Sequence, residues 1–330
     1  MHSGAIKVGI AGARAPVRRR WTAAVALLLA GAGCATPPEP AQPWEPRLRG
    51  DAVVLLGEVH DNAEQHRLRL AVLRRALHAG WRPAIAMEQF DADRQPDIER
   101  ARRERPLDAQ HLIAQAAPAL SGWDWSHYRP VIALALQHGL PLRAANLPRE
   151  QSRRLVKDGY AAVLGAERVR ELGLAPAPGA DWQAAQEREM DAGHCKRLPP
   201  ALLGGMARAQ FARDALMAHI VREHAPRGVL LLAGNGHVRR DLGVPRWLAD
   251  FSPSRLWAVG FVEAPDAQVS SGAFDAVVVT APAPRSADPC DQVLPPVPLR
   301  PSSNSSSTRQ AVGGSSQPVN SSGTLSTTTK

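Results

Sequence analysis

The sequence predicts an α/β fold: a mainly parallel sheet with helices on both faces and a helix-rich insertion over about residues 149–224. Three observations lead to this class. Short apolar runs recur along the chain, turn residues bound them, and helical patterns separate them. Apolar runs of about four to eight residues bounded by glycine are typical of buried parallel strands. Strands that alternate with helices indicate βαβ units, and therefore a parallel sheet.

The elements follow one another in a regular order. The first predicted strand is Ala52–Leu56, and a helix follows it. Asn62 and Gln65 have the spacing of a capping box at the start of that helix, and Gly80 caps its end. A second helix is predicted over His127–Gln137. The further predicted strands are Ala84–Met87, Pro141–Ala145, Val229–Ala233, Leu256–Val262 and Ala276–Thr280.

The two ends of the chain differ in composition from this body. Arg18-Arg19-Arg20, a short apolar run and Gly31-Ala32-Gly33-Cys34 follow one another, which is typical of a secretory signal too short to span a bilayer. We predict a lipoprotein signal over residues 1–33, with Cys34 as the lipidated residue. Ordinary cleavage beside an incidental cysteine is the alternative. A proline-rich tether covers 34–48, the folded domain 49–298, and a disordered Ser/Thr-rich tail 299–330.

Net charge limits the binding partners that the sequence predicts, and the cysteine content limits the possible disulfides. The chain has 40 basic and 31 acidic residues, and the predicted signal removes five basic ones, so the mature balance is close to neutral. No run of five basic residues remains, so a nucleic-acid partner is not indicated. Cys195 and Cys290 form an even pair in an exported chain, which allows one disulfide. Two free thiols are the alternative.

Polar residues follow four of the predicted strands. Glu58 and His60 lie in a G-x-x-H turn after the first strand, Glu88 and Asn146 follow the next two, and His237 ends a second G-x-x-H turn. Ligands of parallel sheets bind just beyond the carboxyl ends of the strands. His60, His237 and Glu88 are a possible Zn²⁺ or Mn²⁺ set. The same groups suit acid and base roles, or simple capping and ion pairing.

One later helix adds two polar residues. Gln210 and Asp214 are four residues apart in a stretch that is otherwise rich in Ala, Leu, Phe and Met. Their spacing places both on one helical face. We interpret this pair as pointing into a pocket, and a solvent-facing stripe is the alternative.

Several of these segments resemble the ChaN family of bacterial lipoproteins within the Tiki/TraB-like superfamily. They span roughly residues 50–292 and include Leu55-Leu56-Gly57-Glu58-Val59-His60-Asp61, Ala86-Met87-Glu88-Gln89-Phe90, Ala144-Ala145-Asn146-Leu147-Pro148-Arg149, Ala209–Ala218 and Ala233-Gly234-Asn235-Gly236-His237. The resemblance implies haem binding and uptake by a possible homodimer, with tyrosine ligation of iron. It also implies kinship with metal-dependent proteases marked by two G-x-x-H motifs and a glutamate.

Two functions follow as hypotheses. The first is a membrane-anchored haem-binding lipoprotein (an acyl chain such as palmitate on Cys34) that serves haem and iron uptake at the bacterial cell envelope, facing the periplasm or the cell surface. Tyr160 is its freer ligand candidate, Tyr128 suits packing at a helix start, and His194 is a further contact. The second is a hydrolase in which Glu58 or Glu88 acts as base and Asn146 donates to a developing oxyanion. An inert scaffold ranks last.

Overall fold

The computed structural model describes residues 41–117, 122–264 and 272–292. The chain divides into two compact units, 1–41 and 42–330, and the fold below belongs to the second. The predicted signal 1–33, Cys34, the first part of the predicted tether (34–40) and the tail 299–330 lie outside the described residues. No helix within the described ranges is long and apolar enough to cross a membrane.

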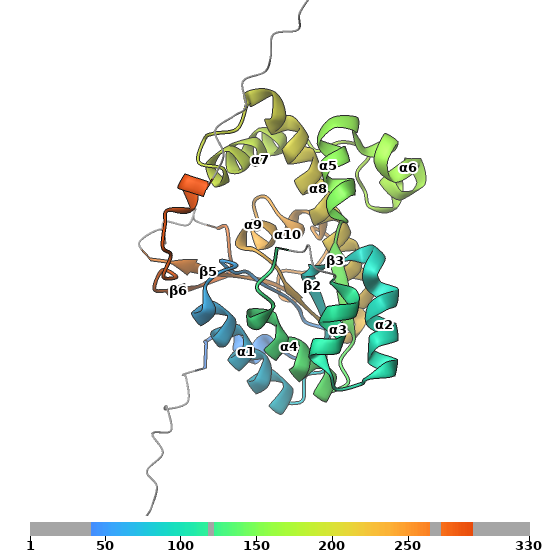
Figure 1. Cartoon of the computed structure of the whole chain (residues 1–330), viewed down its shortest axis with the longest axis vertical. Coiled ribbons are helices and arrows are strands. Elements are labelled where there is room, and N and C mark those ends of the chain that lie inside the picture. The colour runs from blue at the N-terminus through green and yellow to red at the C-terminus, as the bar shows by residue number, and fades with distance from the viewer. Residues whose placement is uncertain (1–40, 118–121, 265–271, 293–330) are drawn as a thin grey trace, which may run out of the picture. The chain divides into compact units, whose positions relative to one another are not determined.

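Six parallel strands form one sheet, which confirms the predicted fold class (Figure 1). Their order across the sheet is β3-β2-β4-β1-β5-β6. The strands are β1 (Val53–Leu56), β2 (Ala84–Asp91), β3 (Leu142–Asn146), β4 (Val229–Leu232), β5 (Leu256–Glu263) and β6 (Ala276–Thr280).

The helices divide into three groups. The first comprises α1 (Ala63–His78), α2 (Gln95–Glu104), α3 (Ala109–Ala116) and α4 (Trp125–Gln137). The second is the predicted helix-rich insertion, with α5 (Arg149–Asp158), α6 (Tyr160–Glu171), α7 (Ala180–Gly193) and the long α8 (Pro200–His224). The short helices α9 (Asn235–Val238) and α10 (Val244–Trp247) follow β4. Single turns of 3-10 helix lie at Glu45–Arg47, Ala92–Arg94, Ala225–Arg227 and Pro289–Gln292.

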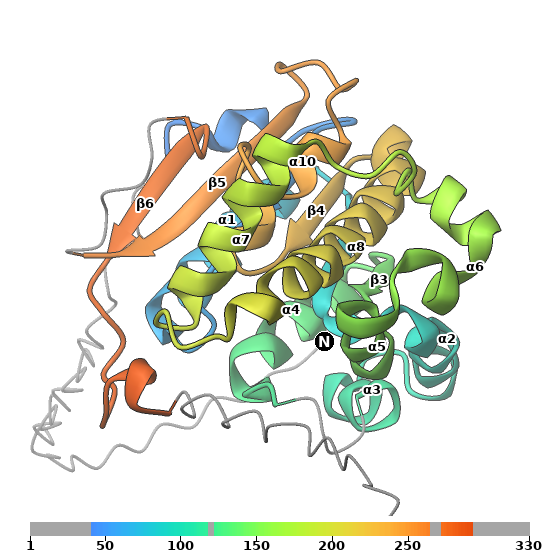
Figure 2. The ribbon, with the colours of Figure 1, turned by 90° about the horizontal axis from the view of Figure 1, so that it is seen from above.

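Helices cover both faces of the sheet. Alternate residues of each strand point to opposite faces, so each strand contributes buried side chains to both. Val54 and Leu56 of β1 pack with α1 and α4, whereas Val53 and Leu55 pack with α8 and α10. Figure 2 shows α7, α8 and α10 in front of the sheet and α1 behind it. A third apolar cluster joins α5 and α6 to α8. Side chains buried on both faces explain why these strands appear in the sequence as continuous apolar runs.

Two differences from the predicted elements matter for the site. Strand β2 continues to Asp91, four residues beyond its predicted end, so Glu88 lies inside the strand and not after it. Helices α2 and α3 occupy a region for which the sequence patterns predicted no element. Helix α2 buries only Ile98 and Ala101, which leaves too narrow an apolar stripe for periodicity to reveal.

Candidate functional site

The strand ends that carry polar residues meet at the carboxyl edge of the sheet. Leu56 of β1 and Met87 of β2 both pair with Leu232 of β4, so these three strands are level where they reach this edge. Glu58 and Glu88 therefore follow at the same height, beside the turn that leads to His237. Side chains from α1, α4 and α8 complete the site.

Glu58 is buried, and donors from two helices and from its own turn surround it. The Tyr128 hydroxyl donates to its Oε1 over 2.5 Å, and His60 Nδ1 contacts the same oxygen at 2.7 Å. Arg69 forms an ion pair with Oε2. Burial alone would raise the pKa of Glu58, but Arg69 and the His60 hydrogen bond lower it to about 2. Glu58 is therefore an ionised carboxylate inside the protein.

His60 connects this carboxylate to the solvent-accessible side of the site. An ionised carboxylate only accepts hydrogen bonds, so Nδ1 of His60 carries the proton. Its Nε2 has no hydrogen-bond partner among the described residues, and 46% of the side chain is exposed. Burial lowers the pKa of His60, but the Glu58 hydrogen bond and the charge of Glu88 raise it further, so the net shift is upward. The Trp123 and His60 rings pack edge to face, with 4.8 Å between their centroids.

His66 supports Arg69 from the same helix. Its Nδ1 accepts from the Arg69 guanidinium at 2.9 Å, and its Nε2 contacts the His60 carbonyl at 2.9 Å. Burial and the charge of Arg69 lower the pKa of His66 to about 4. His66 is therefore neutral at pH 7, and it holds Arg69 in place for Glu58 without adding charge.

His237 lies between two buried carboxylates in a second network. Its Nδ1 lies 2.5 Å from Asp214 Oδ1 of α8, and its Nε2 lies 3.3 Å from Glu88 Oε1. Gln210 also contacts Nδ1 at 3.0 Å, and Arg213 donates to Glu88 over 2.5 Å. Burial lowers the pKa of His237, but the two carboxylates outweigh it and raise the pKa to about 9. The imidazolium therefore keeps its proton at neutral pH.

Replacing Asp214 by asparagine should lower the pKa of His237, because one of the two carboxylates that raise it is lost. The stabilisation that His237 gains from its proton is complete below pH 6.5 and is lost as pH rises through about 9. The Asp214→Asn variant should therefore lose stability at a lower pH than the unmodified chain. An NMR titration of the imidazole measures the shift, and an unchanged pKa would show that Asp214 does not hold the proton.

Gly234 lets the two networks approach each other. A Cβ at this position would lie 2.9 Å from His60 Nε2 and 3.7 Å from Glu88 Oε2. The Gly234 N–H also donates to Glu88 over 2.7 Å. The glycine is needed here for close approach, and its backbone has ordinary extended angles.

Replacing Gly234 by alanine should therefore displace the His60 ring and destabilise the fold by about 1–3 kcal/mol through overpacking. Gly236 is a matched control in the same turn, because a Cβ there would meet nothing within 4 Å. Denaturant unfolding of both variants measures the difference. Equal effects at the two glycines would contradict this account of the close packing.

A cavity of about 520 Å³ opens beside both networks. Ala116, Ala117, Trp123 and Leu147 give it an apolar wall. Its polar lining is Gln89, Asp91, Asp93, Arg94, Asn146, Arg149, Ser152 and Arg213. Its size and mixed lining are typical of a small-molecule site.

Several predicted contributors lie elsewhere or are already bonded. Tyr160 begins α6 and packs against the α5–α8 cluster, where burial raises its pKa to about 12. His194 follows α7, and its Nδ1 contacts the Met190 carbonyl at 2.7 Å. Asn146 ends β3 and donates its amide to Asp91 at 3.3 Å. This contact uses one of the two N–H groups of the Asn146 amide, so its role as an oxyanion donor stays a prediction.

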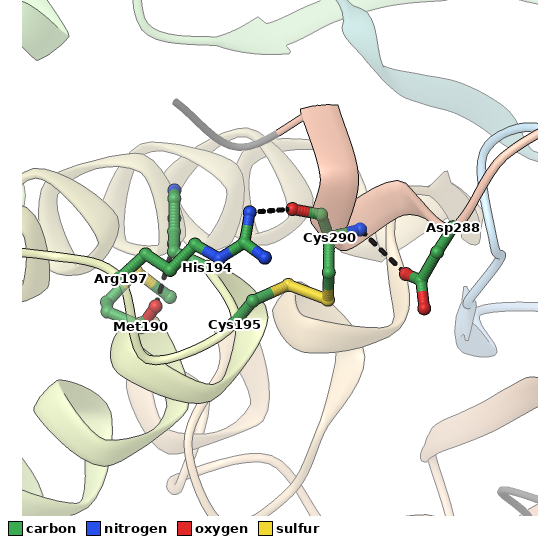
Figure 3. Close-up of a disulfide and its surroundings, with 6 residues drawn as sticks. All are labelled: Met190, His194, Cys195, Arg197, Asp288 and Cys290. Atoms are coloured by element: carbon green, nitrogen blue, oxygen red, sulfur yellow. Dashed lines mark hydrogen bonds between the residues drawn. A yellow bond between two sulfur atoms is a disulfide. The ribbon is translucent and has the colours of Figure 1, made fainter. Parts of the chain in front are cut away.

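The structure pairs Cys195 with Cys290 in a disulfide (Figure 3). The bond connects the loop before α8 to the 3-10 turn after β6, and the guanidinium of Arg197 donates to the Cys290 carbonyl. It fastens the end of the described chain to the helical insertion.

The predicted zinc or manganese set is not assembled as a metal site in the part of the chain that the structure describes. Among residues 41–117, 122–264 and 272–292, no group of three or more His, Cys, Asp and Glu side chains is arranged to hold a metal ion. Glu88 already accepts from Arg213 and from Gly234. Glu88 and His237 belong to one ion-pair network with Asp214 and Arg213, and His60 belongs to the other, with Glu58.

Sequence reasoning missed three residues of the site: Arg69, Arg213 and Trp123. Arg69 and His66 are buried on the same helical face as Leu73. Polar residues inside an apolar helical stripe are the signal that would have identified them. Arg213 lies between Gln210 and Asp214 in the sequence. It was not predicted as a site residue because arginines are usually exposed.

The fold and the site define an α/β protein with a polar site and a small-molecule cavity at the carboxyl edge of its sheet. The family model described as "Haem-binding uptake, Tiki superfamily, ChaN" matches residues 45–248. The chain therefore belongs to the ChaN family of haem-binding uptake proteins.

The chain has the fold of one solved structure and a weaker likeness to another. ChaN of Campylobacter jejuni, described as binding haem cofacially, is 20% identical with a TM-score of 0.56 over 70% of this chain and 87% of that chain. An erythromycin esterase mutant in its open conformation is 14% identical with a TM-score of 0.40, over 66% of this chain and 71% of that chain. A search of curated protein sequences finds no match.

Proposed function

We propose that this protein binds haem in the cavity at the carboxyl edge of the sheet, with His60, which packs against the cavity residue Trp123, as the iron ligand. The free Nε2 of His60 carries the proposal. Glu58 accepts from the opposite ring nitrogen, and a carboxylate in this position orients a metal-bound histidine and makes it more basic. A histidine on one side of haem iron is a common arrangement.

The lining of the cavity fits the rest of the haem group. Trp123, Ala116, Ala117 and Leu147 offer an apolar wall to the macrocycle. The Arg149 side chain is exposed, forms no ion pair among the described residues and offers charge to a propionate. Arg94 and Arg213 add positive charge to the lining, although they also pair with Asp97 and Glu88. Bound haem would supply an iron centre for storage or transfer, and the protein would supply its ligand and its charge balance.

The tyrosines are less suited to the ligand role. Tyr128 is only 1% exposed, and its hydroxyl donates to Glu58. Burial and the negative charge of Glu58 raise the pKa of Tyr128 well above its usual value. The pKa of Tyr160 is also raised, so neither tyrosine is close to the anionic form that iron prefers.

The cellular role is part of the same proposal. Acylation at Cys34 would hold the protein to a membrane of the cell envelope, where haem and iron enter the cell. The predicted signal sequence and the family support this role. A homodimer is proposed on the basis of the family.

A titration of the mature chain with haemin tests the binding. We expect saturation at about one haem per chain, followed through the Soret band. The Arg149→Gln variant should bind more weakly, because one propionate partner is lost. Absence of saturable binding in the unmodified chain would overturn the proposal.

A hydrolase is the second candidate, and the Glu58–His60 pair favours it. A histidine whose Nδ1 is held by a buried carboxylate has a free Nε2 that can take a proton from water. The N–H groups of His237 and Arg213 are bonded to Asp214 and Glu88, but the positive charges of the two residues would stabilise a developing oxyanion nearby. His60 then acts as the base, and the two cations balance the charge without a metal.

Hydrolysis of p-nitrophenyl acetate by the haem-free chain tests this second candidate. The His237→Gln variant should lose hydrolysis while keeping haem binding, and stoichiometric haemin should block hydrolysis if both ligands share the cavity. Hydrolysis that is equal in the unmodified chain and in the His60→Ala variant would remove this candidate.

A further inference from the structure

The amino edge of the sheet, opposite the candidate site, is a surface built from four loops. Trp81 donates from its indole N–H to the Gly50 carbonyl over 3.1 Å. The Arg255 guanidinium donates to the Asp51 carbonyl and, with another nitrogen, to Ala225. The loops before β1, β2, β4 and β5 are therefore joined into one continuous surface.

This surface is strongly positive. We define the amino-edge face as Arg47, Arg49, Arg82, Arg227 and Arg255, all carried by these loops. The same loops, residues 47–52, 79–83, 225–228 and 248–255, hold two acids: Asp51 pairs with Arg255 at 3.0 Å, and Asp250 pairs with Arg222 at 2.6 Å. Among the described residues, the other four arginines of the face have no acidic partner.

The face also has a concave part. A cavity of about 580 Å³ is lined by Arg47, Arg49, Arg255 and the serines Ser252 and Ser254, with residues 50–52. Guanidinium and hydroxyl groups together form strong, directional hydrogen bonds to phosphate oxygens. Arg47 also lies over the Trp257 ring at 3.9 Å, which fixes its position.

The position of the predicted lipid anchor along the chain points to a membrane surface as the partner of this face. The fold begins at this edge, because the 3-10 turn Glu45–Arg47 carries the first arginine of the face. Gln42 lies eight residues after Cys34, so a fully extended link covers at most about 29 Å. An acyl chain on Cys34 therefore keeps the amino-edge face close to the lipid headgroups, whose anionic members attract basic residues.

We propose that the amino-edge face docks on anionic phospholipid headgroups, so that the haem cavity at the opposite edge faces away from the membrane. The orientation of the haem cavity rests on the proposed lipid anchor at Cys34. The attraction between the amino-edge face and anionic headgroups does not depend on that anchor, so the anchor and the attraction can be tested separately.

The test uses the chain from residue 34 with Cys34→Ser, which removes the acylation site. Binding to phosphatidylglycerol-containing vesicles is compared with binding to phosphatidylcholine vesicles by sedimentation. The R49Q/R227Q double variant should reduce partitioning to the anionic vesicles by about 30-fold, since each basic residue near a charged surface contributes about 5-fold. Raising the salt concentration should have the same effect as the substitutions.

The R170Q/R188Q double variant is the matched control. It removes two exposed arginines from α6 and α7 and leaves the amino-edge face intact. Its partitioning should be unchanged. Equal binding to neutral vesicles, or an equal loss in this control, would overturn the proposed face. Loss of envelope localisation in Cys34→Ser cells reports on the anchor alone, and the haemin titration reports on haem alone.

Discussion

Replacing Arg69 by methionine should lower the free energy of unfolding by about 3–5 kcal/mol, because it leaves the Glu58 carboxylate buried without its counter-charge. Methionine keeps most of the side-chain volume, so the loss reports on charge and not on packing. Urea unfolding at neutral pH measures it. Surface substitutions usually change the free energy of unfolding only slightly. A loss of less than about 1 kcal/mol in the Arg69→Met variant would therefore contradict the role of Arg69.

The double variant Glu58→Gln with Arg69→Met is the control. It removes both charges, so it should recover much of the stability that Arg69→Met alone loses. The pH dependence gives a second check. The lowered pKa of Glu58 contributes about 3 kcal/mol that is present above pH 4.5 and is lost as pH falls through about 2. This contribution should be absent in the double variant.

Replacing His60 by alanine should weaken haemin binding by more than about 100-fold. Loss of a group that only supports a metal ligand already costs about 10–100-fold, and loss of the ligand itself costs more. The fold should remain intact, because 46% of the His60 side chain is exposed. A haemin titration followed by visible absorption gives the dissociation constant.

Tyr160→Phe and His194→Ala are the matched controls for this variant. Both residues are partly buried and lie on the helical insertion or at its loop, away from the Glu58 network. Haemin affinity should be unchanged in both. If affinity collapses in Tyr160→Phe and survives in His60→Ala, the ligand assignment is wrong.

Much of the fold is predictable because burial on both faces gives the strands a clear sequence pattern. Strands β1, β4, β5 and β6 lie within a residue or so of the apolar runs that predicted them. Strand β2 was predicted too short, because its last residues include Glu88 and Gln89. Polar residues usually end a buried strand. Here Glu88 continues it, since Arg213 and the Gly234 N–H satisfy its carboxylate.

The position of the site in the fold could be predicted from the sequence, but the contacts between its residues could not. The sequence indicates that Glu58, His60, Glu88 and His237 meet at one edge, because parallel strands share their carboxyl side. Which group bonds to which depends on side chains far apart in the chain. The hydroxyl of Tyr128 and the carboxylate of Glu58 are 70 residues apart, and no local pattern connects them. A metal set and an ion-pair network use the same residue types, so spacing alone did not separate them.

The visible absorption spectrum of the haemin complex tests the central claim most directly, because it reports the iron ligand itself. We predict a histidine-type spectrum in the unmodified mature chain that persists in Tyr160→Phe and is lost in His60→Ala. A long-wavelength charge-transfer band typical of tyrosinate ligation, lost in Tyr160→Phe and kept in His60→Ala, would contradict the assignment of His60 as the haem ligand.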